Sequence, residues 1–171
     1  MRYGSQWSIP ETFTEKQRQE ILETIKEFEH QFAMVEEFGE EALLVWKKIN
    51  EERGYKKGKY LVEKHGITGN GLDAVRQLIE AYLDEDAERT ARPEISLEGD
   101  ILTITSSNFC PIIETAKIMN LNMAHTCPFS TRPYFLAMCR AVNPGIKHKN
   151  AKWRTKGDRT CQEIFWIEGD I

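Results

Sequence analysis

The chain has 171 residues, of which 40% are hydrophobic and 29% are charged, and its net charge is −4. This length fits one domain, and this composition excludes a disordered chain, a collagen and a disulfide-stapled miniprotein. No apolar run approaches the ~18 residues of a membrane span, and the first residues lack the apolar core of a signal peptide. We therefore expect a cytoplasmic protein without a membrane partner.

The charge is unevenly distributed along the chain. Residues 1–109 carry 14 Lys and Arg against 22 Asp and Glu, whereas residues 110–171 carry 9 against 5 and hold all four cysteines. We therefore expect the first segment to be scaffold and the second segment to carry the chemistry.

The chain divides into a flexible arm, residues 1–10, and a single domain, residues 11–171. Within the domain, apolar residues recur at helical spacing over about residues 11–90. From about residue 93 to 168, period-two alternation appears beside two further helical segments. Helices followed by strands around two helices predict an α+β fold whose C-terminal antiparallel sheet has about four strands.

Helices are predicted in the first part of the domain. Thr12 and Glu15 fit a capping box and start a helix that reaches about residue 37. A second helix is expected to end at Gly54 and to be followed by a weaker helical turn, and Asn70 is expected to cap a third helix. The apolar residues expected to face inward are Ile21, Ile25, Phe28, Phe32, Ala42, Val45, Trp46, Ile49, Leu72, Val75, Leu78, Ile79 and Tyr82.

The second part mixes strands and helices. Alternation on both sides of Glu98-Gly99-Asp100 predicts a β-hairpin. Proline is favoured at the first helical position, so Cys110 is expected at the N-cap of a helix that Pro111 begins. The remaining expected elements are a helix over about residues 132–142 and strands over about 146–154 and 160–168.

The four cysteines, Cys110, Cys127, Cys139 and Cys161, form no C-x-x-C pair, so their spacing does not indicate a zinc ribbon. Cys139 lies at helical spacing among apolar residues and is expected in the core. Cys110 and Cys127 each precede a proline, and a thiol at a helix N-terminus has a lowered pKa. His125, two residues before Cys127, could serve it as a base or as a co-ligand. Inert burial beside a helix cap is the alternative for both thiols.

Seven basic residues and one acidic residue fall between residues 140 and 159. Three interpretations stay open: a site for the carboxylate or phosphate of a small molecule, a nucleic-acid contact, and a solvated edge strand protected by lysines. The isoelectric point near 5.7 argues against nucleic acid.

Several short motifs occur in an order that resembles the C-terminal half of the L-2-amino-thiazoline-4-carboxylic acid hydrolase-like family. The motifs are His125-Thr126-Cys127-Pro128, Tyr134-Phe135-Leu136-Ala137, Asn143-Pro144-Gly145-Ile146-Lys147 and Asp158-Arg159-Thr160-Cys161-Gln162-Glu163-Ile164-Phe165. The resemblance covers roughly residues 94–168. More distantly, the chain resembles 4-vinyl-reductase-like small-molecule-binding domains.

This resemblance implies a pocket between helices and a curved antiparallel sheet. It also implies that water opens a cyclic thiazoline amidine that bears a carboxylate. The positions that match are Cys127, Asn143-Pro144 and Cys161.

Our leading hypothesis is therefore a small-molecule-processing domain that hydrolyses a C–N bond of a cyclic amidine. Cys127 would be the nucleophile and His125 its base. The side chains expected to hold the substrate, including its carboxylate, are Lys147, Lys149, Arg154 and Asn143.

Two alternatives remain beside this hypothesis. A divalent metal such as zinc could deliver the water, with His125, Cys127 and Cys161 as its ligands. Alternatively, the chain is a non-catalytic ligand-, metal- or redox-sensing module that uses Cys110, Cys127 or Cys161. The sequence leaves the substrate, the cofactor and the formation of a homo-oligomer open.

Overall fold

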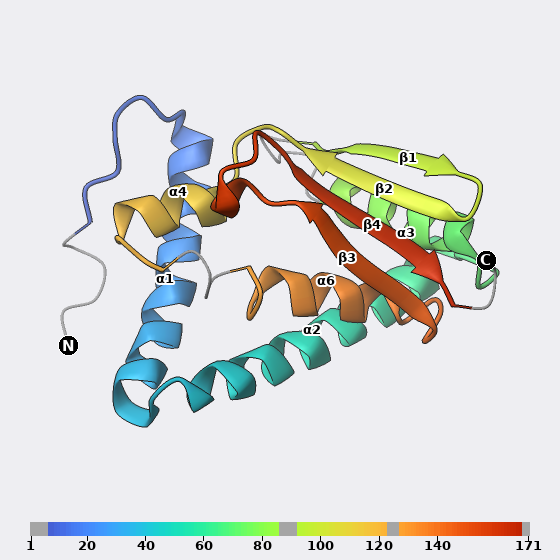
Figure 1. Ribbon diagram of the computed structural model, residues 1–171, viewed down its shortest axis with the longest axis horizontal. Coiled ribbons are helices and arrows are strands. Elements are labelled where there is room, and N and C mark those ends of the chain that lie inside the picture. Colours follow the sequence, from blue (N-terminus) through green and yellow to red (C-terminus); the bar gives the residue numbers. More distant parts are fainter. Residues whose placement is uncertain (1–6, 86–91, 123–126, 169–171) are drawn as a thin grey trace.

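The computed structural model describes residues 7–85, 92–122 and 127–168. Helices come first, and a four-stranded antiparallel sheet with two intervening helices follows in the described part of the chain (Figure 1), which confirms the predicted α+β class. The elements are α1 (Glu15–Phe38), α2 (Glu41–His65), α3 (Leu72–Asp84), β1 (Glu94–Glu98), β2 (Ile101–Ser106), α4 (Pro111–Ile118), α6 (Thr131–Cys139), β3 (Ile146–Lys152), a 3-10 turn (Arg154–Lys156) and β4 (Cys161–Ile167). None of the described helices has the length and apolar character of a membrane span.

Helix α1 is capped two residues later than predicted. The hydroxyl of Thr14 accepts the backbone N–H of Gln17 (3.3 Å), and the side-chain oxygen of Gln17 accepts the backbone N–H of Thr14 (3.0 Å). The predicted pair Thr12 and Glu15 was wrong, because glutamine completes a capping box as well as glutamate does.

Helix α2 continues through Gly54, where it was predicted to end. A Cβ atom at Gly54 would lie 2.0 Å from the backbone oxygen of Tyr134, and one at Gly58 would lie 2.3 Å from that of Met138. The two glycines therefore allow the backbone of α6 to lie directly against α2. This packing outweighs the cost of about 1 kcal/mol that glycine carries in a helix.

Three of the predicted core residues of α1 and α2 were wrong. Val45 and Ile49 were expected inside, but they lie on the face of α2 opposite α6 and are 52% and 39% exposed. Phe32, near the end of α1, is 40% exposed. All three residues lie at helical spacing, but this periodicity does not indicate which face of a helix packs against another helix or the sheet.

The sheet has the strand order β1-β2-β4-β3, and its inner face packs on α3 and α6. Residues directly opposite in an antiparallel pair share a face, and Leu102 of β2 pairs with Phe165 of β4, both 0% exposed. Met138 and Cys139 of α6 belong to the same core. The prediction that Cys139 is a core residue is confirmed.

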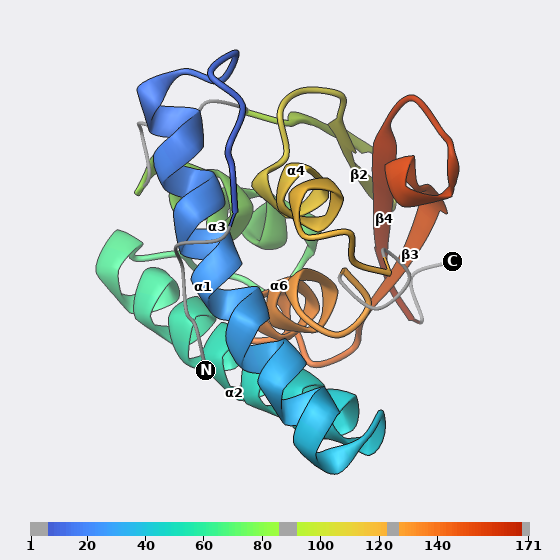
Figure 2. The ribbon, with the colours of Figure 1, turned by 90° about the vertical axis from the view of Figure 1, so that its left-hand side faces the viewer.

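A second, smaller core joins α1 to α4. It contains Ile21, Ile25 and Phe28 of α1 together with Met119, which follows α4. Figure 2 shows α1 and α4 side by side, at one end of the sheet. The described residues therefore form two cores, and the candidate site lies between them.

Candidate functional site

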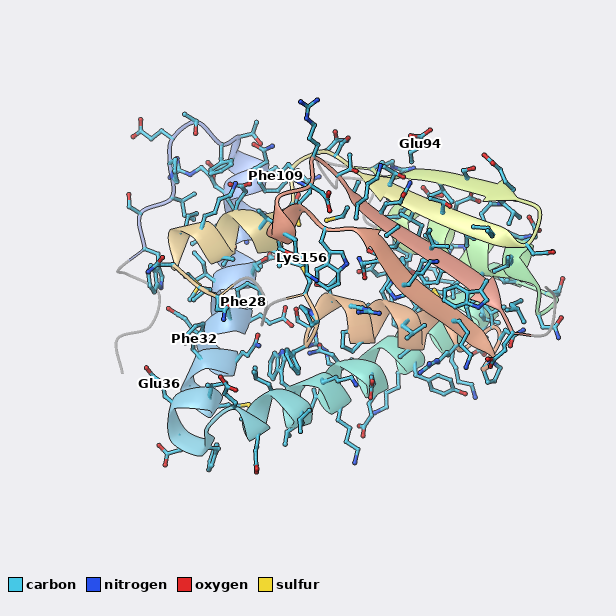
Figure 3. All side chains as sticks on the ribbon, viewed as in Figure 1. Phe28, Phe32, Glu36, Glu94, Phe109 and Lys156 are labelled. Carbon is cyan, nitrogen blue, oxygen red and sulfur yellow. The ribbon has the colours of Figure 1, made fainter. Side chains whose placement is uncertain are left out.

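A cavity of about 530 Å³ lies between the two cores. Its wall includes Phe28 on α1 and Phe109 just before α4, which Figure 3 labels, and it extends to residues of α2, α3, β2, β4 and α6. Small-molecule sites commonly measure 300–1,000 Å³. The space therefore suits a compact ligand.

Aromatic rings form much of this wall. Phe28 and Phe109 contribute from the smaller core, and Tyr82, Tyr134 and Phe135 contribute from the larger one. The ring centroid of Tyr82 lies 6.2 Å from that of Tyr134 and 6.1 Å from that of Phe135. Rings in edge or tilted contact present flat apolar surfaces, against which a planar ligand can stack.

Three cysteines line the cavity: Cys110, Cys127 and Cys161. They come from the N-cap of α4, the loop before α6 and the first residue of β4, and none of the four cysteines is in a disulfide. The backbone N–H of Arg154 donates to Sγ of Cys161 (3.4 Å). The fold thus brings Cys127 and Cys161, which the sequence analysis placed in one site, to one cavity.

Cys110 occupies the predicted N-cap of α4, but its thiol behaves differently from the expectation. Burial raises the pKa of Cys110, and this effect exceeds the opposing one of the backbone N–H groups of Ile113 and Ile112. The predicted lowering of this pKa was wrong because the loss of water disfavours the thiolate more than the helix N-terminus favours it.

The inner face of the sheet contributes the carboxylate of Glu163 to the cavity wall, and a chain of two hydrogen bonds holds that carboxylate. Nε of Arg132 donates to Nδ1 of His148 (3.2 Å), and Nε2 of His148 lies 2.8 Å from Oε2 of Glu163. Arginine can only donate, so Nδ1 accepts and the imidazole proton sits on Nε2, from which it is donated to Glu163. The imidazole is 1% exposed and lies against Phe165, with ring centroids 4.6 Å apart.

Arg132, His148 and Glu163 were not predicted as site residues, although one sequence signal points to His148 and Glu163. His148 lies opposite Phe165 in the sheet, and Glu163 precedes Phe165 by two positions. The side chains of His148, Glu163 and Phe165 therefore lie on the inner face of the sheet. Polar residues at inward positions of predicted strands need a partner when buried. Alternation on the two C-terminal strands therefore indicated a buried polar pair.

The three arginines that line the cavity are each held by a contact within the protein. Arg53 lies 3.6 Å from the carboxylate of Glu27, which also lines the cavity. Arg92 lies 2.7 Å from Asp84, and Nη1 of Arg154 donates to the backbone oxygen of Asn108. These contacts fix the guanidinium groups in place at the wall.

The residues predicted to bind a carboxylate do not lie together in the structure. Arg154 lines the cavity. Lys147 and Lys149 do not, because they pair with Trp166 and Ile164 on the outer face of the sheet. Lys147 lies 2.8 Å from Glu168, and Nζ of Lys149 lies 5.8 Å from the centre of the Trp166 ring. Ligand binding by the two lysines stays a prediction.

Asn143 also lies away from the cavity wall, in the turn between α6 and β3. Its Oδ1 accepts the backbone N–H of Gly145 (2.7 Å), and its Nδ2 donates to the backbone oxygen of Asn70 (2.8 Å). These bonds show a role in the turn. His125, the predicted base, lies outside the described residues.

The described ranges contain no group of three or more His, Cys, Asp or Glu side chains arranged to hold a metal ion. One of the three predicted zinc ligands, His125, lies outside these ranges. The set of His125, Cys127 and Cys161 therefore stays a prediction.

The sequence matches no protein-family model and no curated protein. The structure is similar to the crystal structure of the phenol-responsive sensory domain of the transcription activator PoxR with phenol. The TM-score is 0.53 at 9% sequence identity, and the match covers 90% of this chain and 75% of that chain. At this identity the similarity shows a shared fold alone.

Proposed function

We propose that this chain is a ligand-sensing domain that binds a small molecule in the cavity between its two cores. The observation that carries the proposal is the cavity of about 530 Å³, with aromatic walls and with the carboxylate of Glu163, which a buried histidine holds in place. The shared fold with a phenol-responsive sensory domain supports it.

The wall favours one class of ligand. Rings of Phe28, Phe109 and Tyr134 favour a compact planar molecule. The carboxylate of Glu163 already receives one hydrogen bond, from His148, and a carboxylate has about four acceptor sites. Glu163 therefore has acceptor sites left for an N–H or O–H group of a ligand.

Titration calorimetry with a panel of phenols, anilines and cyclic amidines tests the proposal. Replacing Glu163 with Gln keeps the shape of the side chain but removes its charge, so Glu163→Gln should weaken binding by about 1.5–3 kcal/mol, the range for a hydrogen bond to a charged group. That loss is tenfold or more in Kd. The matched control is Glu168→Gln, because Glu168 pairs with Lys147 away from the cavity.

Binding that both glutamine variants retain in full would place the ligand elsewhere. Absence of heat with every compound of the panel, at concentrations up to the solubility of each, would contradict the proposed ligand class.

Hydrolysis of a cyclic amidine is the second candidate, and it rests on the resemblance to the amino-thiazoline carboxylate hydrolase-like family. One observation favours it: Cys127, Cys161 and Glu163 line the same cavity. Water would add to the amidine carbon while Glu163 accepts its proton and passes it to the ring nitrogen. This addition forms the C–O bond; the hydroxyl of the adduct then loses its proton and becomes the carbonyl as the C–N bond breaks and the ring nitrogen leaves as an amine. Cys127 as nucleophile is the alternative route.

Incubation with 2-amino-thiazoline-4-carboxylate, followed by mass spectrometry, separates the two candidates. A sensing domain returns the compound intact. A ring-opened product that forms with the wild type, but not with Glu163→Gln or Cys127→Ser, would establish the hydrolase.

A further inference from the structure

The outer face of α2 carries apolar side chains that are exposed to solvent. Leu44, Val45 and Tyr55 are 62%, 52% and 43% exposed. In Figure 1, α2 runs along the lower edge of the molecule, with α6 between it and the sheet. The inner face of α2 is thus covered, whereas its outer face is bare in the described part of the chain.

Six residues of this face form one stripe. Their spacing alternates between four and three, the spacing that keeps side chains in line along a helix that pairs with another helix. They are Glu41, Val45, Lys48, Glu52, Tyr55 and Lys59, all exposed. We call this set the α2 stripe. Because the spacings 4, 3, 4, 3, 4 are the same in both directions, two antiparallel copies can align every member.

The charged members of the α2 stripe are unpaired within the described chain. Glu41, Lys48 and Glu52 make no ion pair there, and neither does Lys59, whose Nζ lies 5.6 Å from the centre of the Tyr55 ring. By contrast, the neighbouring residues Lys47 and Glu51 lie 3.7 Å apart in an ion pair. The stripe therefore offers two positive and two negative groups to a partner.

We propose that a second copy of this chain covers the α2 stripe, with the two α2 helices antiparallel about a two-fold axis at the level of residue 50. Position i of one helix then meets position 100 − i of the other. Glu41 lies opposite the partner's Lys59 and Lys48 opposite the partner's Glu52. Val45 lies opposite the partner's Tyr55. A two-fold axis repeats each contact, so four ion pairs and two apolar contacts form.

Charge selects this arrangement over its neighbours. A shift by one heptad in one direction places Lys48 opposite the partner's Lys59, and a shift in the other direction places Glu41 opposite the partner's Glu52. A parallel pair places each charged residue opposite its own copy. All three alternatives set like charges against each other, which is unfavourable.

The contact is long but narrow. From residue 41 to residue 59 the helix extends about 27 Å at 1.5 Å per residue, and one helix face buries less area than a stable dimer interface normally does. We therefore infer a dimer that forms as concentration rises and weakens as salt rises, because its ion pairs are exposed.

Sedimentation equilibrium of the full chain tests the pairing. The wild type should show a concentration-dependent dimer. Glu41→Lys and Lys59→Glu should each be monomeric, because each sets like charges opposite one another at both ends of the contact. The double variant, and an equimolar mixture of the two single variants, should recover the dimer. Glu94→Lys, a charge reversal on β1 far from α2 (Figure 3), is the matched control and should dimerise like the wild type.

Recovery in the mixture also shows that the single variants are folded. A wild type that stays monomeric up to its solubility limit would overturn the proposal. So would a dimer that survives both single reversals, or reversals whose combination fails to restore it.

Discussion

The two faces of the β3–β4 strand pair differ sharply, although their residues alternate along the same strands. On the inner face, His148 is 1% exposed and donates to Glu163 beside the cavity. On the outer face, Lys147 pairs with Glu168 and is 42% exposed. Because successive side chains of a strand point to opposite faces, a basic cluster that is continuous in sequence is divided in space. The buried polar pair, not the dense charge, marks the candidate site.

The largest expected difference between the two faces is in stability. Phe165 is 0% exposed, so Phe165→Ala should lower the free energy of unfolding by about 3–5 kcal/mol. Trp166→Ala, one residue away on the outer face, should cost less, because the Trp166 side chain is only partly buried and already has part of its surface in water. Urea denaturation of both variants gives the comparison. Similar losses would mean that the two faces are buried alike.

A smaller difference in stability is expected between the variants His148→Ala and Lys147→Ala. His148→Ala removes a buried hydrogen bond to a charged group and should cost about 1.5–3 kcal/mol in unfolding free energy. Lys147→Ala removes an exposed ion pair, which is worth about 0–1 kcal/mol. Thermal unfolding of both variants checks this order. An equal or smaller cost for His148→Ala would show that the chain from Arg132 to Glu163 does not stabilise the fold.

The smallest difference concerns ligand affinity. Arg154 lines the cavity, whereas Lys149 lies on the outer face. For a ligand with a carboxylate, Arg154→Ala should weaken binding by about 1.5 kcal/mol, the low end for a charged hydrogen bond, because this guanidinium already donates to Asn108. Lys149→Ala should leave the affinity unchanged. If calorimetry showed a larger loss of affinity for Lys149→Ala than for Arg154→Ala, the ligand would bind on the outer face of the sheet.

Much of the fold could be predicted from local sequence pattern. The apolar stripes of α1 and α3 and the alternation of β1 and β2 depend on neighbours in sequence, and these elements appear as expected. The continuation of α2 through Gly54 could not be predicted, because it depends on the backbone of Tyr134, 80 residues later. Local propensity disfavours glycine in a helix, and only the packing partner reverses that preference.

The candidate site was also predictable only in part, because some of its residues depend on contacts between distant parts of the chain. The sequence indicated Cys127, Cys161 and Arg154, which line the cavity. Alternation indicated that His148 and Glu163 face inward, but not that they bond to each other, because that contact depends on the register of the two strands. Register is a property of two strands together.

The central claim, that a ligand occupies the cavity, is tested most directly by thiol protection. Iodoacetamide labelling of Cys127 and Cys161 is measured by mass spectrometry, with and without the tightest-binding compound of the calorimetric panel. The matched control is Lys149→Cys, which adds a thiol on the outer face. Binding in the cavity predicts that labelling of Cys127 and Cys161 slows together while the introduced thiol reacts at its unliganded rate. Unchanged labelling of both native thiols at saturation would contradict the account.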